Sequence, residues 1–224
     1  AMAGSTVLAT YRNAQLHGLA GAALSALSCA VVEAHVKVVC LSAAGIGHGH
    51  RWMVTVGGQN SSLSADTTSY ARPAVALLDS KASVPGLRTS GSDYVSITGT
   101  NFGPAHASNV INASYGNADE APLLYEVQGC EVIEAHTRIR CPTAEGVGRN
   151  HSWRITVGHQ TSAASAGTTS YRAPTISSVW RSGGETSLLR TQGNEAVTLT
   201  GTELGPLTLT AAPTMALTMA PTHG

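Results

Sequence analysis

The most regular pattern in the chain is an alternation of apolar and polar residues in two stretches that begin at a tryptophan. In 52–56 (WMVTV) the first, third and fifth residues share one face, and 153–157 (WRITV) repeats this order. A period of two residues is typical of a β-strand with one buried face and one face in solvent. We therefore expect Trp52 and Trp153 to be core residues and not a platform for a ligand.

A second alternating pattern ends in a glycine-containing turn. It occurs at 95–104 (VSITGTNFGP) and again at 197–206 (VTLTGTELGP). The first and third residues of each stretch are expected to face inward, and Phe102 to enter the core after the turn. The equivalent of Phe102 in the later stretch is Leu204.

These patterns belong to a long repeat. A shift of 101 residues aligns the pairs Cys29/Cys130, His35/His136, Cys40/Cys141, Trp52/Trp153 and Tyr70/Tyr171. The period is too long for a solenoid unit and suits a small all-β domain. We expect the C-terminal part of one domain at 1–72, a complete domain at 73–173, the N-terminal strands of a further domain at 174–210, and a low-complexity tail at 211–224.

The incomplete end copies need strands from elsewhere. Either the chain continues beyond this sequence with further copies, or neighbouring subunits complete the folds by strand addition. We expect the former. Pro73 and Pro174 each follow the last expected strand of a copy after a very short join, so neighbouring domains are expected to have restricted orientations.

The four cysteines form two pairs with ten residues between the members of each pair, a spacing that fits neither zinc sites nor redox motifs. Strands that pair about a two-residue turn at 34–35 would place Cys29 opposite Cys40, and likewise Cys130 opposite Cys141. We prefer two disulfides to buried free thiols. Disulfides imply an oxidising compartment.

The same pairing of the second hairpin places Glu131 opposite Arg140, a favourable cross-strand pair on the solvent face. His35 and His136 would lie at the hairpin turns, in contact with water.

Three N-x-S/T sequons, at Asn60, Asn112 and Asn150, agree with a secreted or cell-surface protein that carries N-glycans. The side chain of Asn112 should point away from the inward Ile111 and Ala113.

Charge limits the class of partner. The chain has 13 basic and 13 acidic residues, and only 12% of its residues are charged. A neutral chain gains little from counterion release, which disfavours a nucleic-acid partner and polybasic membrane attachment. The apolar stretch 16–32 is too short to span a membrane, so no membrane segment is expected.

Candidate chemistry is sparse. His48 and His50 could lie close together, but the second copy has Arg149 and His151 there, and no further ligand completes a set. We interpret these histidines as loop-surface residues. No serine, histidine and aspartate set is common to the copies, so we expect no catalytic residue, metal or cofactor.

The order of motifs carries a family resemblance. The GTNFGP turn at 99–104, the Cys-x10-Cys hairpin, the G-x-G loop, the W-x-V-T-V-G-x-Q strand and the T-S-Y-x-x-P ending resemble the IPT/TIG domain over about residues 6–206. This immunoglobulin-like domain occurs in plexins, fibrocystin-type surface proteins and certain transcription factors. The resemblance implies tandem early-set immunoglobulin-like β-sandwiches of the extracellular kind, and no enzyme.

The sequence therefore predicts a structural or adhesive segment of a large cell-surface protein, such as a stalk, coat or filament, with protein–protein contacts to neighbouring domains or subunits. One alternative is a receptor ectodomain, for which Trp180 with Leu188 and Leu189 would form the ligand patch. Another is a carbohydrate-binding accessory module, which the low aromatic content of 4% opposes. Neutral charge and paired cysteines oppose a nuclear DNA-binding domain.

Overall fold

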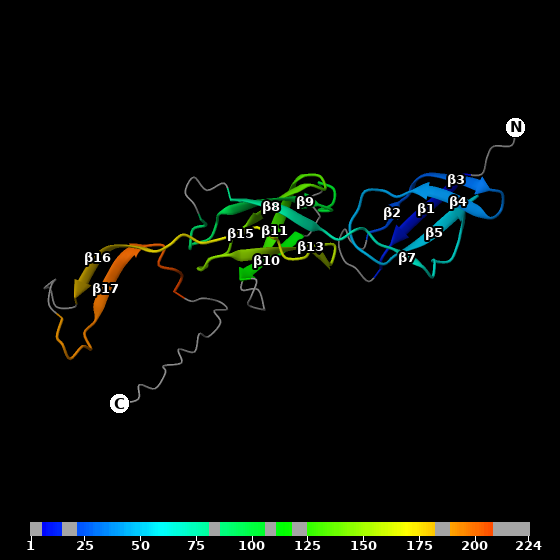
Figure 1. Ribbon diagram of the computed structural model, residues 1–224. Coiled ribbons are helices and arrows are strands. Elements are labelled where there is room, and N and C mark those ends of the chain that lie inside the picture. Colours follow the sequence, from blue (N-terminus) through cyan, green and yellow to red (C-terminus); the bar gives the residue numbers. More distant parts are fainter. Residues whose placement is uncertain are drawn as a thin grey trace, which may run out of the picture.

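The computed structural model contains only β-strands and their connections in the residues that it describes, which are 6–14, 22–80, 86–105, 111–117, 125–181 and 189–207. Three parts lie one after another along the molecule (Figure 1). We call them the N-terminal segment (6–72), the middle segment (73–173) and the C-terminal hairpin (174–207). The expected tail at 211–224 lies outside the described residues.

The strands of the N-terminal segment are β1 (Val7–Arg12), β2 (Leu24–Ser25), β3 (Leu27–Glu33), β4 (Lys37–Leu41), β5 (His50–Val56), β6 (Gln59–Asn60) and β7 (Thr67–Thr68). Those of the middle segment are β8 (Ala74–Ser80), β9 (Tyr94–Thr100), β10 (Ile111–Asn117), β11 (Tyr125–Glu134), β12 (Arg138–Pro142), β13 (His151–Val157), β14 (Gln160–Thr161) and β15 (Thr168–Thr169). The C-terminal hairpin consists of β16 (Thr175–Arg181) and β17 (Val197–Thr202).

The middle segment is one antiparallel strand path in the order β14-β13-β10-β11-β12-β9-β8, and β15 also pairs with β13. The path folds into two layers because the first part of β11 pairs with β10 and its last part pairs with β12. Gly129, with a φ of 77°, lies where β11 changes partners. At the far end of the path β8 returns to contact β13 and β15.

A single core fills the space between these layers. Its fully buried side chains include Trp153, Tyr115, Phe102, Leu87, Ile97, Ile111, Ile139 and Ile155. They come from both layers, and Val75 and Leu78 of β8 pack against them. The alternation that predicted inward residues at Val95, Ile97 and Trp153 therefore holds across two layers of sheet.

The N-terminal segment has the same pairings where its strands exist. Tyr11 pairs with Trp52 in the β1–β5 ladder, as Tyr115 pairs with Trp153 in the β10–β13 ladder. Strands β2 and β3 take the place of the two parts of β11, and Ser28, with a φ of 47°, takes the place of Gly129. Strands β3 and β4 form a separate two-stranded sheet, with no described strand in the place that β9 takes beside β12.

The C-terminal hairpin has the register of the β8–β9 hairpin. Val179 pairs with Leu199 as Leu78 pairs with Ile97, and both hairpins have an irregularity near the start of the first strand. No described residues cover it from the other side, and its apolar side chains are exposed: Ile176, Val179, Trp180, Leu189, Val197, Leu199 and Leu204.

The turns of the cysteine hairpins differ from the expected two-residue form. Glu33 pairs with Lys37, so the turn has three residues, and a bulge between Val31 and Glu33 then restores the register that places Ala30 opposite Val39. The second hairpin has the same bulge, and Glu131 still pairs with Arg140. The bulge shifts the register by one residue near the turn, while the residues further along the strands still point to the expected faces. An alternating sequence pattern gives no sign of such a bulge.

Serines cover the outer edge of β5 and of β13. The Ser64 N–H donates to the Trp52 carbonyl (2.9 Å), and its Oγ accepts from the Trp52 N–H (2.9 Å). Ser61 does the same for Val54. Ser162 and Ser165 repeat both contacts on β13. Because the edge groups are already bonded, these edges are closed to a further strand.

Candidate functional site at the segment junctions

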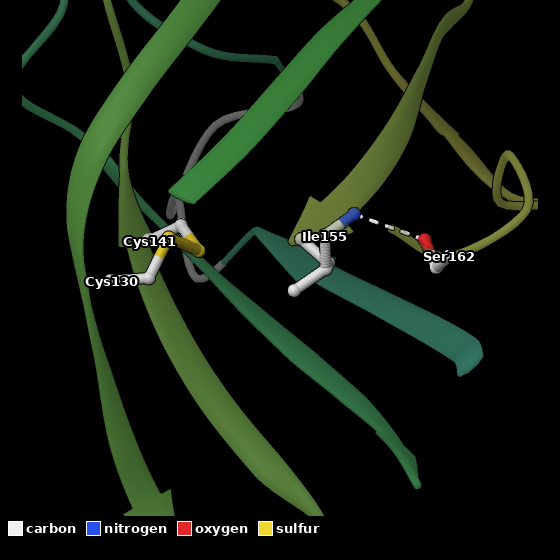
Figure 2. Close-up of a disulfide and its surroundings, with 4 residues drawn as sticks. All are labelled: Cys130, Cys141, Ile155 and Ser162. Atoms are coloured by element: carbon white, nitrogen blue, oxygen red, sulfur yellow. Dashed lines mark hydrogen bonds between the residues drawn. A yellow bond between two sulfur atoms is a disulfide. The ribbon is translucent and has the colours of Figure 1, made fainter. Parts of the chain in front are cut away.

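The structure joins the cysteines in the pairs that their spacing predicts. Cys130 and Cys141 form one disulfide with a Cα–Cα distance of 4.2 Å, and Cys29 and Cys40 form the other at 4.0 Å. In Figure 2 the Cys130–Cys141 bridge links the two hairpin strands, and Ile155 of β13 belongs to the same core. The Cys130–Cys141 bridge is buried, whereas Cys29 and Cys40 are both partly exposed.

The three sequons differ in environment. Asn60 and Asn150 are exposed on connections or short edge strands. Asn112 lies on β10, between two other strands, and alternates as expected with the buried Ile111 and Ala113. Its side chain is nevertheless only partly exposed and its amide oxygen is buried. The folded protein therefore presents Asn60 and Asn150 to solvent more openly than Asn112.

Of the predicted core markers, Trp153 and Phe102 are completely buried. Trp52 is partly exposed although it has the contacts of Trp153: it stacks on Tyr11 with ring centroids 4.1 Å apart, and its Nε1–H donates to Thr68 Oγ1 (2.9 Å). The difference arises because no described strands cover the face of the N-terminal segment that β8 and β9 cover in the middle segment.

The interpretation of His50 and His151 as loop-surface residues is wrong. His50 is 1% exposed, and one of its ring nitrogens lies 3.2 Å from the carbonyl of Ile46. Burial lowers the pKa of His50, against the raising effect of that backbone contact. His48 is exposed. Among the described residues no group of three or more histidine, cysteine and carboxylate side chains could hold a metal ion.

Tyrosine pairs close the end of each segment at which these histidines lie. The hydroxyls of Tyr115 and Tyr171 are 2.7 Å apart, Tyr171 donates to the Ala144 carbonyl (2.9 Å), and the Ala144 N–H donates to Tyr115 (2.9 Å). Tyr11 and Tyr70 hold Ala43 in the same way. In the sequence, Tyr70 and Tyr171 stood out only as markers of the repeat, although their fixed spacing to the glycine loop was a usable signal.

The tyrosine-held glycine loop of the N-terminal segment is also where the middle segment docks. Gln160, just after the turn that follows β13, reaches back with its amide Nε2, which donates to the Gly47 carbonyl (3.0 Å) and the Tyr70 carbonyl (3.1 Å). Asn101 Nδ2 donates to the Arg72 carbonyl (2.9 Å). Neutral amides thus tie two segments that only a few residues connect.

A cavity of about 100 Å³ lies inside this first junction. Its walls come from both segments, with Ile46 and Tyr70 on one side and Gly103, His136 and Val157 on the other. The His136 backbone is fixed there, because its N–H donates to the Gly103 carbonyl (2.7 Å). The space is that of a few water molecules, so it is too small for a ligand pocket, which usually has about 300–1,000 Å³.

The second junction, between the middle segment and the C-terminal hairpin, uses a charged side chain. Glu203 accepts from the Thr89 N–H (2.7 Å) and hydroxyl (2.9 Å), and lies 3.5 Å from the guanidinium of Arg172. Arg172 also donates through Nε to the Gly86 carbonyl (3.2 Å). The bonds from Thr89 and the charge of Arg172 hold the pKa of Glu203 below its usual range, against a raising effect of burial.

Both junctions are built on the same turn. Asn101 and Glu203 follow the Gly-Thr pair of their strands and have positive φ values of 63° and 57°. The glycine two residues later faces the preceding segment. Gly103 lines the cavity of the first junction together with Ile46, and Gly205 lies so close to Val147 that an added Cβ would be 2.9 Å from its Cγ1. The sequence showed this turn as a repeated motif and gave no sign that it docks onto the neighbouring segment.

No protein-family model matches this chain, and no curated protein matches its sequence. In the described part of the chain, no helix has the length and apolar character needed to cross a membrane.

Proposed function

We propose that this chain is a structural segment of an extracellular protein built from tandem immunoglobulin-like β-sandwiches of the IPT/TIG kind. Its role is to hold consecutive domains in a fixed order and orientation, as a stalk, coat or filament requires. Nothing in this proposal needs a catalytic group or a cofactor, and the partners are other domains of the same kind.

The observation that carries the proposal is that two junctions of similar construction follow one another along the chain. A flexible tether between independent domains would need no side chains directed at the preceding domain. Here Gln160 and Asn101 bond to carbonyls of the N-terminal segment, and Glu203 bonds to the middle segment through an equivalent turn. Each hydrogen bond restrains the relative orientation of two neighbouring segments. Together the bonds restrict bending at connections that are only a few residues long.

The extracellular location is supported by the two disulfides and by the exposed sequons. Disulfides persist in oxidising compartments, and N-glycans are added to secreted chains. Expression through a secretory pathway should give glycan at Asn60 and Asn150, and non-reducing peptide mapping should recover Cys29–Cys40 and Cys130–Cys141. Free thiols in the secreted protein would contradict this part of the proposal.

The orientation claim can be tested by electron–electron distance measurements. Spin labels at Leu8→Cys on β1 and Leu77→Cys on β8, both exposed positions, report on the first junction. Labelled protein is diluted into unlabelled protein so that only distances within one chain contribute. We expect one narrow distance distribution in the wild-type background.

Removing the junction bonds should broaden that distribution. Gln160→Ala with Asn101→Ala removes three bonds across the first junction. The matched control is Gln59→Ala, which removes the corresponding amide of the N-terminal segment, an exposed side chain outside this junction. A distribution that is already broad before any change would contradict the proposed function.

A further inference from the structure

The N-terminal segment has an open apolar cleft. The cleft has a volume of about 630 Å³ and is lined on its two sides by residues of β1, β3, β4 and β5 and the β3–β4 turn, among them Val7, Cys29, Val31, Val38 and Val56. In the middle segment the corresponding residues face β8 and β9 in a closed core. In the described residues, no hairpin covers this cleft as β8 and β9 cover the corresponding place in the middle segment.

The C-terminal hairpin has the form that fits this place. Every pair of its register matches a pair of the β8–β9 register, with Val197 and Leu199 at the positions of Val95 and Ile97. In the middle segment those two side chains are completely buried, whereas Val197 and Leu199 are 40% and 50% exposed. A two-stranded hairpin with an uncovered apolar face is marginally stable in water, so this hairpin needs a partner.

The edge of the cleft is also open to strand pairing. No strand of the described chain pairs with β4 on the side that corresponds to the β9 side of β12. Another edge of the segment, on β5, is closed by Ser61 and Ser64. Of these two edges, only that of β4 is open to strand addition.

We propose that the C-terminal hairpin of one copy of this chain inserts into the cleft of a second copy. In the register of the β12–β9 ladder, β17 pairs with β4 so that Leu199 lies opposite Val38 and Val197 lies opposite Cys40. The inserted apolar side chains complete the core around Trp52 and the Cys29–Cys40 bridge. The inference rests on the proposed function, because it assumes that the three parts are domains of one kind.

The insertion would also rebuild a junction between the two chains. Gln59 follows β5 as Gln160 follows β13, and it is exposed. Once the hairpin is seated, the middle segment of the first chain lies where the N-terminal segment lies in the first junction. Gln59 of the second chain then donates to the Gly148 and Tyr171 carbonyls, which correspond to the acceptors of Gln160.

Assembly of this kind joins copies head to tail. The donor strands β16 and β17 and the strands β3 and β4 that line the cleft lie at opposite ends of the described chain (Figure 1), so a copy that donates its hairpin still has its own cleft free. Such head-to-tail contacts produce linear chains unless a rotation closes them into a ring. The expected product is a rod of copies in which every junction has the same construction.

Analytical ultracentrifugation of the 224-residue chain with its disulfides intact tests the proposal. The wild-type chain should form a concentration-dependent series of oligomers. Leu199→Asp in the hairpin or Val38→Asp in the cleft should each abolish the series. Leu8→Asp, an exposed position on the outer face of β1, is the matched control and should leave the series unchanged.

A mixture of the two interface variants separates a lost contact from a misfolded chain. The Leu199→Asp chain keeps an intact cleft and the Val38→Asp chain keeps an intact hairpin, so an equal mixture should form dimers and nothing larger. A mixture that stays monomeric, like a wild-type chain that stays monomeric, would overturn the proposal.

Cross-linking tests the register. Val39→Cys in one tagged chain and Thr198→Cys in another lie on the outer face at the positions of Arg140 and Ser96, which are a directly opposed pair. They should form a disulfide between chains, whereas Leu8→Cys with Thr198→Cys should not. Equal cross-linking in both mixtures would contradict the insertion.

The role of Gln59 distinguishes this inference from the proposed function. Gln59→Ala should shift the oligomers toward monomer and leave the intrachain distance distribution narrow. Gln160→Ala should broaden the intrachain distance distribution and leave the oligomers unchanged. A monomeric wild-type chain with a narrow distribution would overturn the inference and leave the proposed function standing. A monomer whose β4 edge is protected from hydrogen exchange would mean that another part of the same chain fills the cleft, which also overturns it.

Discussion

The N-terminal and middle segments have corresponding side chains and different degrees of closure. Val56 is 43% exposed, whereas Val157, at the same place on β13, is 2% exposed. At the opposite end the two segments agree, because Tyr11 and His50 are as deeply buried as Tyr115 and His151. The tyrosine and histidine end is closed by its own segment, and the cysteine and valine end is closed only where a β8–β9 hairpin is present.

This contrast separates two sources of stability. The tyrosine pair, the buried histidine and the edge serines occur in both segments and need no further strands. The second source is burial of apolar area by a hairpin, at roughly 25 cal/mol for each Å² removed from water. Changes at the open end should therefore cost little in the N-terminal segment and much in the middle segment.

The largest difference is expected for the two tryptophans. Trp153→Ala removes a completely buried side chain and should lower the free energy of unfolding of the middle segment by about 3–5 kcal/mol. Trp52→Ala removes a partly exposed side chain and should cost the N-terminal segment about half as much or less. Urea unfolding followed by NMR peaks of each segment measures both. Equal losses would break the comparison, and Leu77→Ala, at an exposed position, is the control.

A smaller change in the free energy of unfolding, of opposite sign in the two segments, is expected where β11 changes partners. Gly129→Ala should cost about 1–2 kcal/mol, because the positive φ is unfavourable for a side chain although the site has open space. Ser28 already bears that cost at the corresponding position, so Ser28→Gly should stabilise the N-terminal segment by about 1 kcal/mol. Denaturant midpoints of the two variants measure the pair, and a destabilising Ser28→Gly would show that the backbone correspondence is wrong.

The smallest change in the free energy of unfolding is expected on lowering the pH, through protonation of His50. Because burial lowers the pKa of His50 in the folded state, the unfolded chain binds the proton more tightly. The contribution is fully present above the unfolded pKa of about 6.5, and it is lost progressively as the pH falls from there toward the folded pKa. NMR titration of the His50 ring should give a pKa below the usual histidine value of about 6.5. An unshifted His50 would mean that the tyrosine end is open as well.

Local patterns were enough to predict the strands and their partners within a hairpin. The alternation around Trp153 and the ten-residue spacing of the cysteines depend on neighbours along the chain, and the Glu131–Arg140 pair follows from the same ladder. Even there the turn length was wrong, because a bulge compensates for the extra residue.

What could not be predicted depends on packing between distant parts. His50 looks like a loop residue beside two glycines, and only the return of Tyr11 and Tyr70 encloses it. The exposure of Trp52 depends on strands that do not belong to its own ladder. The contacts of Gln160 with Gly47 and Tyr70 and the contact of Glu203 with Thr89 join residues at least 90 positions apart. The repeated motif therefore indicated where a junction lies and not what it contacts.

Hydrogen exchange of β4 and β12 tests the central claim most directly. In dilute protein, the amides of β12 that point to β9 should be strongly protected, and the corresponding amides of β4, which have no described strand beside them, should exchange rapidly. That result would show that the two segments differ by one hairpin. Equal and strong protection of β4 and β12 in the dilute monomer would contradict the account.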